Sequence, residues 1–307
     1  MGKTTYKVAT RASKLAYKQT EQAINLLKQH YPEATFEIHK ISTKGDRRQE
    51  RSLSQFGGQG VFVKEIEQAL LNGEMDFAVH SLKDVPTKVD QDLELCAFPR
   101  REIPNDLFLT RDGSTIHTIR EGFVVGTGSP RRQVQIRRIR PDAHCKDIRG
   151  NIDTRLSKLE HDDYDAIVLA AAGFKRAGRQ YDSNHIMPVD VSLPAIGQGV
   201  LALQCRKSDR QLINLLQAVN HRETELEIMA ERKFMKELGG GCQIPVAAYA
   251  KINGTVMNIE GLIGDRSMKR SIRMKLSGPP EQGEEIAQKL AAEMLDRCEN
   301  ENIQFQA

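Results

Sequence analysis

The first two hundred residues alternate short apolar runs with amphipathic segments, and this alternation constrains the fold more than any other feature. Residues 6–10 and 35–41 have the apolar and β-branched character of strands, and residues 14–31 between them carry apolar side chains at helical spacing. Strands separated by helices are typical of a largely parallel sheet with helices on its faces. The sequence therefore predicts an α/β fold.

The alternation runs through two successive stretches, which predicts two similar α/β units. The first continues with a helix over 61–74 and a strand over 76–80, and the second opens near Arg100. In the second unit we expect strands over 122–129, 143–150 and 165–173 and helices over 130–140 and 151–162. Residues 193–206 are interpreted as an extended return crossing. Two units joined by such crossings would form a cleft between them, where ligands often bind.

The pattern changes near residue 220, which indicates a small α+β domain at the C-terminal end. We expect helices over 222–238 and 284–298 and strands over 246–252, 255–263 and 271–277. Asn253-Gly254 predicts a hairpin between the first two of these strands.

Composition excludes several classes of protein. Hydrophobic residues make up 39% and charged residues 28%, the net charge is +4, and no apolar run approaches the ~18 residues of a membrane span. The N-terminal residues lack the apolar core of a signal peptide, so we expect a cytoplasmic, reduced protein. The five cysteines are scattered without metal-ligand spacing, which predicts neither a disulfide framework nor a metal site.

One cysteine stands out by its context. Cys96 and Cys205 lie in apolar runs and are interpreted as core residues, whereas Cys242 follows three consecutive glycines. Glycines allow turns and close approach of a bulky group to the backbone. Cys242 is therefore either a thiol presented to a ligand or a loop cysteine of no consequence.

Cationic and hydroxyl side chains gather where predicted strands end and helices begin. In open α/β sheets, ligands bind beyond the carboxyl ends of the strands, so these side chains predict an anionic ligand with several carboxylates or phosphates. The set comprises Arg11, Ser13, Ser81, Lys83, Asp84, Thr127, Ser129, Arg131, Arg132, Arg149, Arg155, Lys175 and Arg176.

The helix predicted over 130–140 has arginines in its first turn, after Ser129 as N-cap and Pro130 at the first helical position. Cations there oppose the helix dipole by ~0.3–1 kcal/mol each, and an anionic ligand would reverse that sign. A solvated basic face is the alternative. Nucleic acid is disfavoured because aromatic residues are 5% and tryptophan is absent.

Asp84 is the lone acidic residue of this cationic set. Nearby positive charges would keep it ionised, which suits stabilising a cationic substrate, although a simple ion pair with Lys83 is the alternative. His80 is interpreted as a packed histidine at the end of a strand rather than as a catalyst.

Several ordered segments identify a resemblance: "ATRASKLA", "HSLKDVP", "GTGSPRRQ", "RGNIDTRLSKL", "DAIVLAAAGFKR", "PAIGQG" and "GGGCQIPVAAYA". Over essentially its whole length the chain resembles the porphobilinogen deaminase (hydroxymethylbilane synthase) family. The resemblance implies two similar periplasmic-binding-protein-like α/β domains with a cleft between them, plus a small C-terminal α+β domain with a three-stranded sheet. The implied domains are 1–99 with about 200–218, 100–199, and 219–307, with a mobile loop over about 42–60.

The resemblance also implies an activity. Members attach a dipyrromethane cofactor to a cysteine through a thioether, and the matching residue is Cys242. Four porphobilinogen molecules are added head to tail with loss of ammonia, and the growing polypyrrole is released as hydroxymethylbilane. We expect a monomer without nucleic-acid or membrane partners. A non-catalytic two-lobed binding protein for a polycarboxylate or phosphate is the alternative.

By the same resemblance, Asp84 would be the catalytic residue. The cofactor would be held by Cys242, Ser81, Lys83, Asp84, Thr127, Ser129, Arg131, Arg132 and Gln198. The substrate or growing chain would be held by Arg11, Ser13, Gln19, Arg149, Arg155 and Arg176. The chain departs from the common family pattern at Gln59, Asn105, Gly128, Pro130 and Asp153.

Overall fold

The computed structural model describes residues 4–42, 63–161, 163–239 and 244–305. By its internal contacts the chain divides into two compact units. One unit comprises Met1–Glu102 and Gly199–Glu225, and the other comprises Ile103–Gln198 and Leu226–Ala307. The predicted boundaries of three domains stay a prediction.

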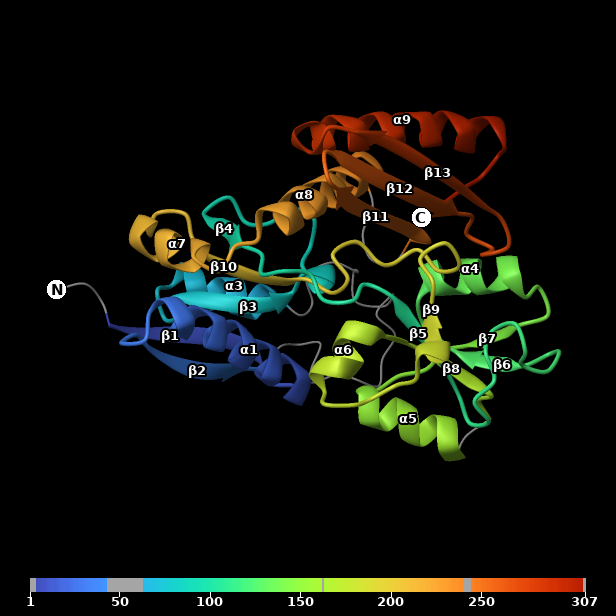
Figure 1. The fold of residues 1–307 in the computed structure, drawn as a ribbon, viewed down its shortest axis with the longest axis horizontal. Coiled ribbons are helices and arrows are strands. Elements are labelled where there is room, and N and C mark those ends of the chain that lie inside the picture. The colour runs from blue at the N-terminus through green and yellow to red at the C-terminus, as the bar shows by residue number, and fades with distance from the viewer. Residues whose placement is uncertain (1–3, 43–62, 162, 240–243, 306–307) are drawn as a thin grey trace. The chain divides into compact units, whose positions relative to one another are not determined.

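The first unit is built on a five-stranded sheet in the order β2-β1-β3-β10-β4 (Figure 1). β1 runs parallel to β2 and β3, whereas β10 runs antiparallel to β3 and β4. The strands are β1 (Thr5–Arg11), β2 (Thr35–Ile41), β3 (Phe77–Ser81), β4 (Leu93–Ala97) and β10 (Leu201–Arg206). The helices are α1 (Lys14–His30), α3 (Lys64–Leu71) and α7 (Arg210–Gln217), with a short 3-10 helix η2 (Leu82–Asp84).

Both faces of this sheet are covered, as the alternation along β1 requires. Val8 packs into a cluster with α1 and α7, and the next residue, Ala9, packs into a cluster with Ile66 and Leu70 of α3. Successive side chains of a strand point to opposite faces, so this split places α3 on the face opposite α1. The N-terminus of α1 is capped, because Ser13 Oγ accepts a hydrogen bond from the Ala16 amide at 3.2 Å.

The second unit contains a sheet of the same design, in the order β7-β6-β8-β5-β9. β6 runs parallel to β7 and β8, and β5 runs antiparallel to β8 and β9. The strands are β5 (Asp106–Thr110), β6 (Val124–Gly126), β7 (His144–Lys146), β8 (Ala166–Ala170) and β9 (Ile186–Met187). Three parallel strands followed by an antiparallel neighbour recur in both sheets, which confirms the predicted pair of similar α/β domains.

Helices again cover both faces of the second sheet. Ile136 of α4 (Pro130–Ile139) packs with Val125 and Val168 on one face. Leu159 of α5 (Ile152–His161) and Phe174 of α6 (Ala171–Arg176) pack on the other. The predicted strand over 165–173 was too long, because Ala171 already begins α6.

The C-terminal part of this unit is a three-stranded antiparallel sheet, β11-β12-β13, with helices α8 and α9 (Figure 1). Its elements are α8 (Arg222–Glu237), β11 (Val246–Asn253), β12 (Val256–Gly264), β13 (Ser271–Gly278) and α9 (Gly283–Asn300). The predicted hairpin is confirmed, since Asn253 pairs with Val256 and Gly254 adopts φ +61°. Phe234 of α8 packs so closely on β12 that a Cβ on Gly261 would lie 2.6 Å from its ring.

Among the helices of the described ranges, none is both long and apolar enough to cross a membrane. In the same part of the chain, no group of three or more histidine, cysteine, aspartate or glutamate side chains could hold a metal ion.

Candidate active site

The carboxyl ends of β1 and β3 bring together one group of the predicted site residues. The two strands are parallel neighbours, so Arg11 and Ser81, their last residues, lie at the same edge of the sheet. Arg11 Nη1 lies 3.8 Å from Asp84 Oδ2 in η2, with exposed fractions of 24% and 40% for the two side chains. Ser81 Oγ donates to Oε1 of the buried Gln19 at 3.0 Å. Lys83 is half-buried between Leu82 and Asp84.

His80, the residue before Ser81 in β3, is buried and does not belong to this group of site residues. It is 5% exposed, and its Nε2 lies 2.9 Å from Gln204 Oε1 of β10. Burial lowers the pKa of His80 to about 4, although hydrogen bonding to Gln204 and the charge of Asp84 oppose this. His80 is therefore neutral near pH 7, which fits its interpretation as a packed histidine.

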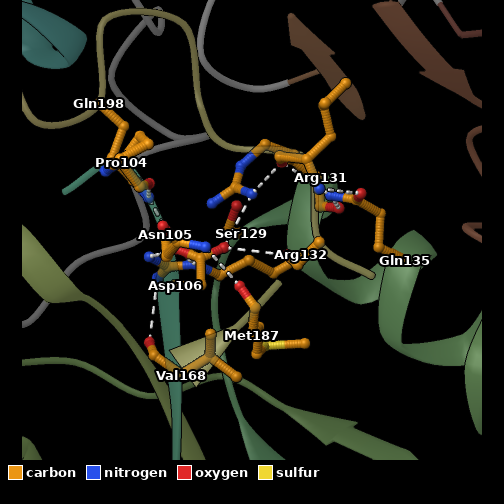
Figure 2. A network of polar contacts seen from close by, with 12 residues as sticks. Pro104, Asn105, Asp106, Ser129, Arg131, Arg132, Gln135, Val168, Met187 and Gln198 are labelled. Atoms are coloured by element: carbon orange, nitrogen blue, oxygen red, sulfur yellow. Dashed lines mark hydrogen bonds and ion pairs between the residues drawn. The ribbon is translucent and has the colours of Figure 1, made fainter. Parts of the chain in front are cut away.

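A buried ion network occupies the matching edge of the second sheet (Figure 2). Asp106, the first residue of β5, is fully buried and lies 2.9 Å from Arg131 Nη1 and 2.7 Å from Arg132 Nη2. Gln198 Nε2 and Ser192 Oγ donate to the same carboxylate at 3.0 and 3.1 Å. Burial alone would raise the pKa of Asp106, but the two guanidiniums outweigh it and hold that pKa well below its usual range.

The arginines of this network are fixed by further hydrogen bonds. Arg132 Nη1 donates to the Val168 carbonyl at 3.0 Å, and Arg131 Nη1 donates to the Leu193 carbonyl at 2.6 Å. Arg131 is 5% exposed and Arg132 is 8% exposed. The basic residues in the first turn of α4 are therefore buried rather than part of a solvated face. Two guanidiniums share one carboxylate, which leaves an excess positive charge at this edge.

More positive charge lies beside this network. Arg149 follows β7, and Arg155 lies in the first turn of α5, where its Nε donates to the Gly150 carbonyl at 2.9 Å. Burial, together with the charges of Arg132 and Arg149, lowers the pKa of Arg155 to about 10, against the opposite pull of Asp147. Like charges held this close favour an anion, because an anion relieves their repulsion.

The two predicted hydroxyl residues of this edge, Thr127 and Ser129, differ in what their side chains do. Thr127 Oγ1 accepts a hydrogen bond from the Ser129 amide at 3.2 Å. Ser129 occupies the N-cap position of α4, and Pro130 is its first helical residue, as predicted, but the Ser129 side chain makes no capping hydrogen bond. Arg176 lies half-buried in the last turn of α6.

The structure shows what three of the residues that depart from the common family pattern contact. Asn105 Nδ2 donates to the Met187 carbonyl at 2.8 Å, which ties β5 to β9. Asp153 pairs with Arg179 at 2.6 Å on an exposed surface. Gly128 lies against the carboxylate of Asp147, whose Oδ1 is 2.3 Å from the place of a Cβ.

Some predictions fall on residues outside the described ranges. These are Cys242, Gln59 and the loop from 43 to 60. The attachment of the cofactor to Cys242 through a thioether and the mobile loop therefore stay predictions. Conversely, sequence reasoning missed Asp106. Its one signal was an acidic residue at the start of the apolar run "DLFLT", where a buried strand would leave a carboxylate in need of cationic partners.

The cationic excess fits a group that carries several carboxylates, such as the dipyrromethane implied by the resemblance. Guanidiniums fixed by backbone carbonyls present their remaining N–H groups without losing side-chain entropy on binding. Fold and charge together define an α/β protein with cationic groups at the carboxyl ends of its parallel strands.

Comparison with known sequences identifies the family. Residues 6–214 match the profile described as "Porphobilinogen deaminase, dipyromethane cofactor binding domain", and residues 225–296 match "Porphobilinogen deaminase, C-terminal domain". Porphobilinogen deaminase of Brevibacillus brevis is 44% identical over 296 residues, covering 95% of each chain. That of Bacillus velezensis is 45% identical over 295 residues, covering 95% of this chain and 94% of the relative. The chain belongs to the porphobilinogen deaminase family, as the resemblance implied.

Solved structures of similar fold are more distant. A nutrient-binding protein of Burkholderia cenocepacia bound to methionine matches with a TM-score of 0.44 and 11% identity, covering 76% of this chain and 97% of that one. A YaeC-family lipoprotein of Enterococcus faecalis matches with a TM-score of 0.43 and 13% identity, covering 78% and 98%. At these values neither similarity adds to the assignment.

Proposed function

We propose that this chain condenses four porphobilinogen molecules head to tail onto a covalently bound dipyrromethane primer and releases hydroxymethylbilane for tetrapyrrole synthesis. The observation that carries this function is family membership over both matched regions, 6–214 and 225–296. Family membership favours the enzyme over the alternative, a non-catalytic binding protein for a polycarboxylate or phosphate.

The cofactor is proposed to be held at Cys242 and at charged and hydroxyl groups of the two strand edges. When bound, the dipyrromethane supplies the electron-rich pyrrole carbon that accepts the first substrate. Arg131 and Arg132 support this role because Asp106 neutralises only one of their two charges. Ser81, Lys83, Thr127, Ser129 and Gln198 are proposed to complete the cofactor contacts.

Substrate binding is proposed to depend on the remaining arginines. Porphobilinogen carries two carboxylates, and Arg149 and Arg155 lie where positive charges already repel one another. Arg11, Ser13, Gln19 and Arg176 are proposed to share this role. Arg11 ends β1, Ser13 is the N-cap of α1, Gln19 of α1 accepts a hydrogen bond from Ser81 at the end of β3, and Arg176 lies in the helix that follows β8.

Asp84 is proposed as the catalytic carboxylate. Loss of ammonia breaks a carbon–nitrogen bond of the substrate and leaves an electron-poor methylene carbon. That carbon then forms a carbon–carbon bond with the terminal pyrrole, which afterwards loses a proton. Asp84 is 40% exposed, so it can face substrate, and its charge would stabilise the positive charge that develops on the pyrrole nitrogen.

The expected environment of the protein is also part of the proposal. Monomeric state is supported by the exposed large apolar side chains of the described residues, Leu71, Met229 and Val256, which lie on separate elements or turns. A role without nucleic acid is supported by the burial of Arg131 and Arg132. A cytoplasmic location is supported by the free thiols of the described cysteines, of which Cys96 and Cys205 lie 3.6 Å apart at sulfur.

Turnover tests the proposed function directly. The purified chain is incubated with porphobilinogen, and ammonia release and the linear tetrapyrrole product are measured together. We expect four ammonia molecules for each hydroxymethylbilane released. Tight binding of porphobilinogen without ammonia release would instead favour a binding protein.

A further inference from the structure

The carboxylate of Asp147 occupies a position that only a glycine at 128 allows. Arg149 donates to Asp147 Oδ2 from Nη2 at 2.8 Å and from Nε at 3.1 Å. The other oxygen, Oδ1, lies 2.3 Å from where a Cβ on Gly128 would be, closer than real Cβ contacts come. The carboxylate thus lies over the backbone of Gly128 while it holds the guanidinium of Arg149.

This arrangement belongs to the edge of the sheet that carries the arginines. Gly126 of β6 pairs with Lys146 of β7 in parallel register, so Gly128 and Asp147 both lie just beyond the carboxyl ends of adjacent strands. The backbone of Asp147 is held in place, because Tyr164 Oη donates to its carbonyl at 2.8 Å. The pairing of β6 with β7 and the hydrogen bond from Tyr164 therefore place the carboxylate of Asp147 beside Gly128.

Asp147 lies among positively charged side chains. Arg132 and Arg149 each repel Arg155, and Asp147 opposes this repulsion at Arg155 while it forms an ion pair with Arg149. The pair is accessible to solvent, with exposed fractions of 31% for Arg149 and 54% for Asp147. Accessible ion pairs contribute little to stability, so an incoming carboxylate can replace Asp147 at Arg149 at small cost.

We propose that Asp147 is a built-in competing carboxylate that porphobilinogen must displace from Arg149, and that Gly128 is the glycine that admits it. Asp147 thereby sets how tightly the acidic substrate binds, without touching the reacting atoms. This inference rests on the proposed function, because it takes Arg149 as a group that receives a substrate carboxylate.

The test compares the holoenzyme with Asp147→Asn, which preserves the shape of the side chain and removes its charge. A charge about 5 Å from a bound carboxylate costs, at the dielectric constant of water, enough to change binding roughly fourfold. We therefore expect KM for porphobilinogen to fall about fourfold with kcat unchanged. At 1 M salt, where the Debye length is about 3 Å, the difference should shrink towards zero.

The matched control is Asp112→Asn, which removes the same charge from the same domain. Asp112 follows the end of β5, and Thr110 there pairs with Ala166 at the start of β8, so Asp112 lies at the opposite edge of the sheet. KM should not change in this variant. A fall in KM equal to that of Asp147→Asn would show an effect of net charge alone and would overturn the proposal.

A glycine substitution tests the same contact from its other side. In Gly128→Ser the new side chain must push the carboxylate of Asp147 away, so KM should fall as in Asp147→Asn. In the double variant Gly128→Ser with Asp147→Asn, KM should fall no further than in either single variant, because both changes release the same guanidinium.

A binding measurement separates this inference from the proposed function. The Nε–H resonance of Arg149, assigned by its loss in Arg149→Lys, is titrated with succinate, an unreactive dicarboxylate. We expect half-saturation at a lower succinate concentration in Asp147→Asn than in the parent chain or in Asp112→Asn. Unchanged or weaker succinate binding together with an unchanged or higher KM would overturn the inference while deaminase turnover persists. Absence of turnover in every variant would overturn the proposed function, and the titration would still decide the role of Asp147.

Discussion

Replacing Asp106 with asparagine removes the carboxylate that two buried guanidiniums share. Arg131 and Arg132 lie 2.9 and 2.7 Å from its oxygens, and Asp106 itself is fully buried. An asparagine retains the shape and part of the hydrogen bonding to Ser192 and Gln198. The variant therefore isolates the effect of the charge on the stability of the second unit.

The magnitude follows from the burial of the two arginines. Removal of one partner from a buried ion pair costs about 3–5 kcal/mol, because the remaining charge is left uncompensated in a poorly solvated place. Here two guanidiniums are left, 5% and 8% exposed, so we expect about 5 kcal/mol. For a unit of this size that corresponds to a fall in Tm of roughly 10–20 °C.

Urea and thermal unfolding of the parent chain and of Asp106→Asn measure this difference. The control is Asp142→Asn, which removes the carboxylate of the Arg140–Asp142 pair, also 2.7 Å apart but more exposed. The free energy of unfolding should fall much less in the control than in Asp106→Asn. Equal losses in the two variants, or an unchanged Tm in Asp106→Asn, would refute the reasoning that burial makes this network expensive to break.

Two further predictions concern the first unit. Burial lowers the pKa of His80 from 6.5 to about 4, so between these values the unfolded chain binds a proton that the folded chain does not, and the free energy of unfolding should fall by about 3 kcal/mol in total as pH falls through this window. His80→Gln should flatten that part of the urea-derived stability profile, and an unaltered slope would show that folded His80 is protonated. Asp84→Asn should lower kcat by about 10²-fold or more with little change in porphobilinogen binding, whereas ordinary turnover would remove Asp84 from its catalytic role.

Features that depend on neighbours in the sequence were predictable. The hairpin at Gly254 and the cap at Ser13 each involve residues no more than three positions apart, so their chemistry is visible in the local pattern. The α/β architecture was predictable too, because buried strands and amphipathic helices have different periodicities, although half of the strand pairings in each five-stranded sheet are antiparallel rather than parallel. That architecture alone places Arg11 and Ser81 at one edge of a sheet.

Features that depend on distant partners were not predictable. Asp106 contacts Arg132, Ser192 and Gln198, which lie 26, 86 and 92 residues away. No local pattern announces such a network, and its carboxylate looks in the sequence like any polar residue beside a strand. The contact between Gly128 and Asp147 is hidden for the same reason, since it forms only when β6 and β7 pair.

The boundary between β8 and α6 was predicted wrongly for a different reason. Residues 165–173 form one apolar run, and apolar runs of this kind do not distinguish a buried strand from a buried helix. The strand ends at Ala170 because the Ala171 amide donates to the Asn105 carbonyl at 3.0 Å, where the chain turns into α6. That turn is decided by tertiary contact rather than by residue type.

Intact-protein mass spectrometry of freshly purified chain tests the central claim most directly, because it reports family chemistry, cofactor and attachment point together. The account predicts a native mass above that of the sequence by two linked pyrrole units, with the excess absent from Cys242→Ser and present in Cys145→Ser. An unmodified mass after exposure to porphobilinogen, or an excess that persists in Cys242→Ser, would contradict it.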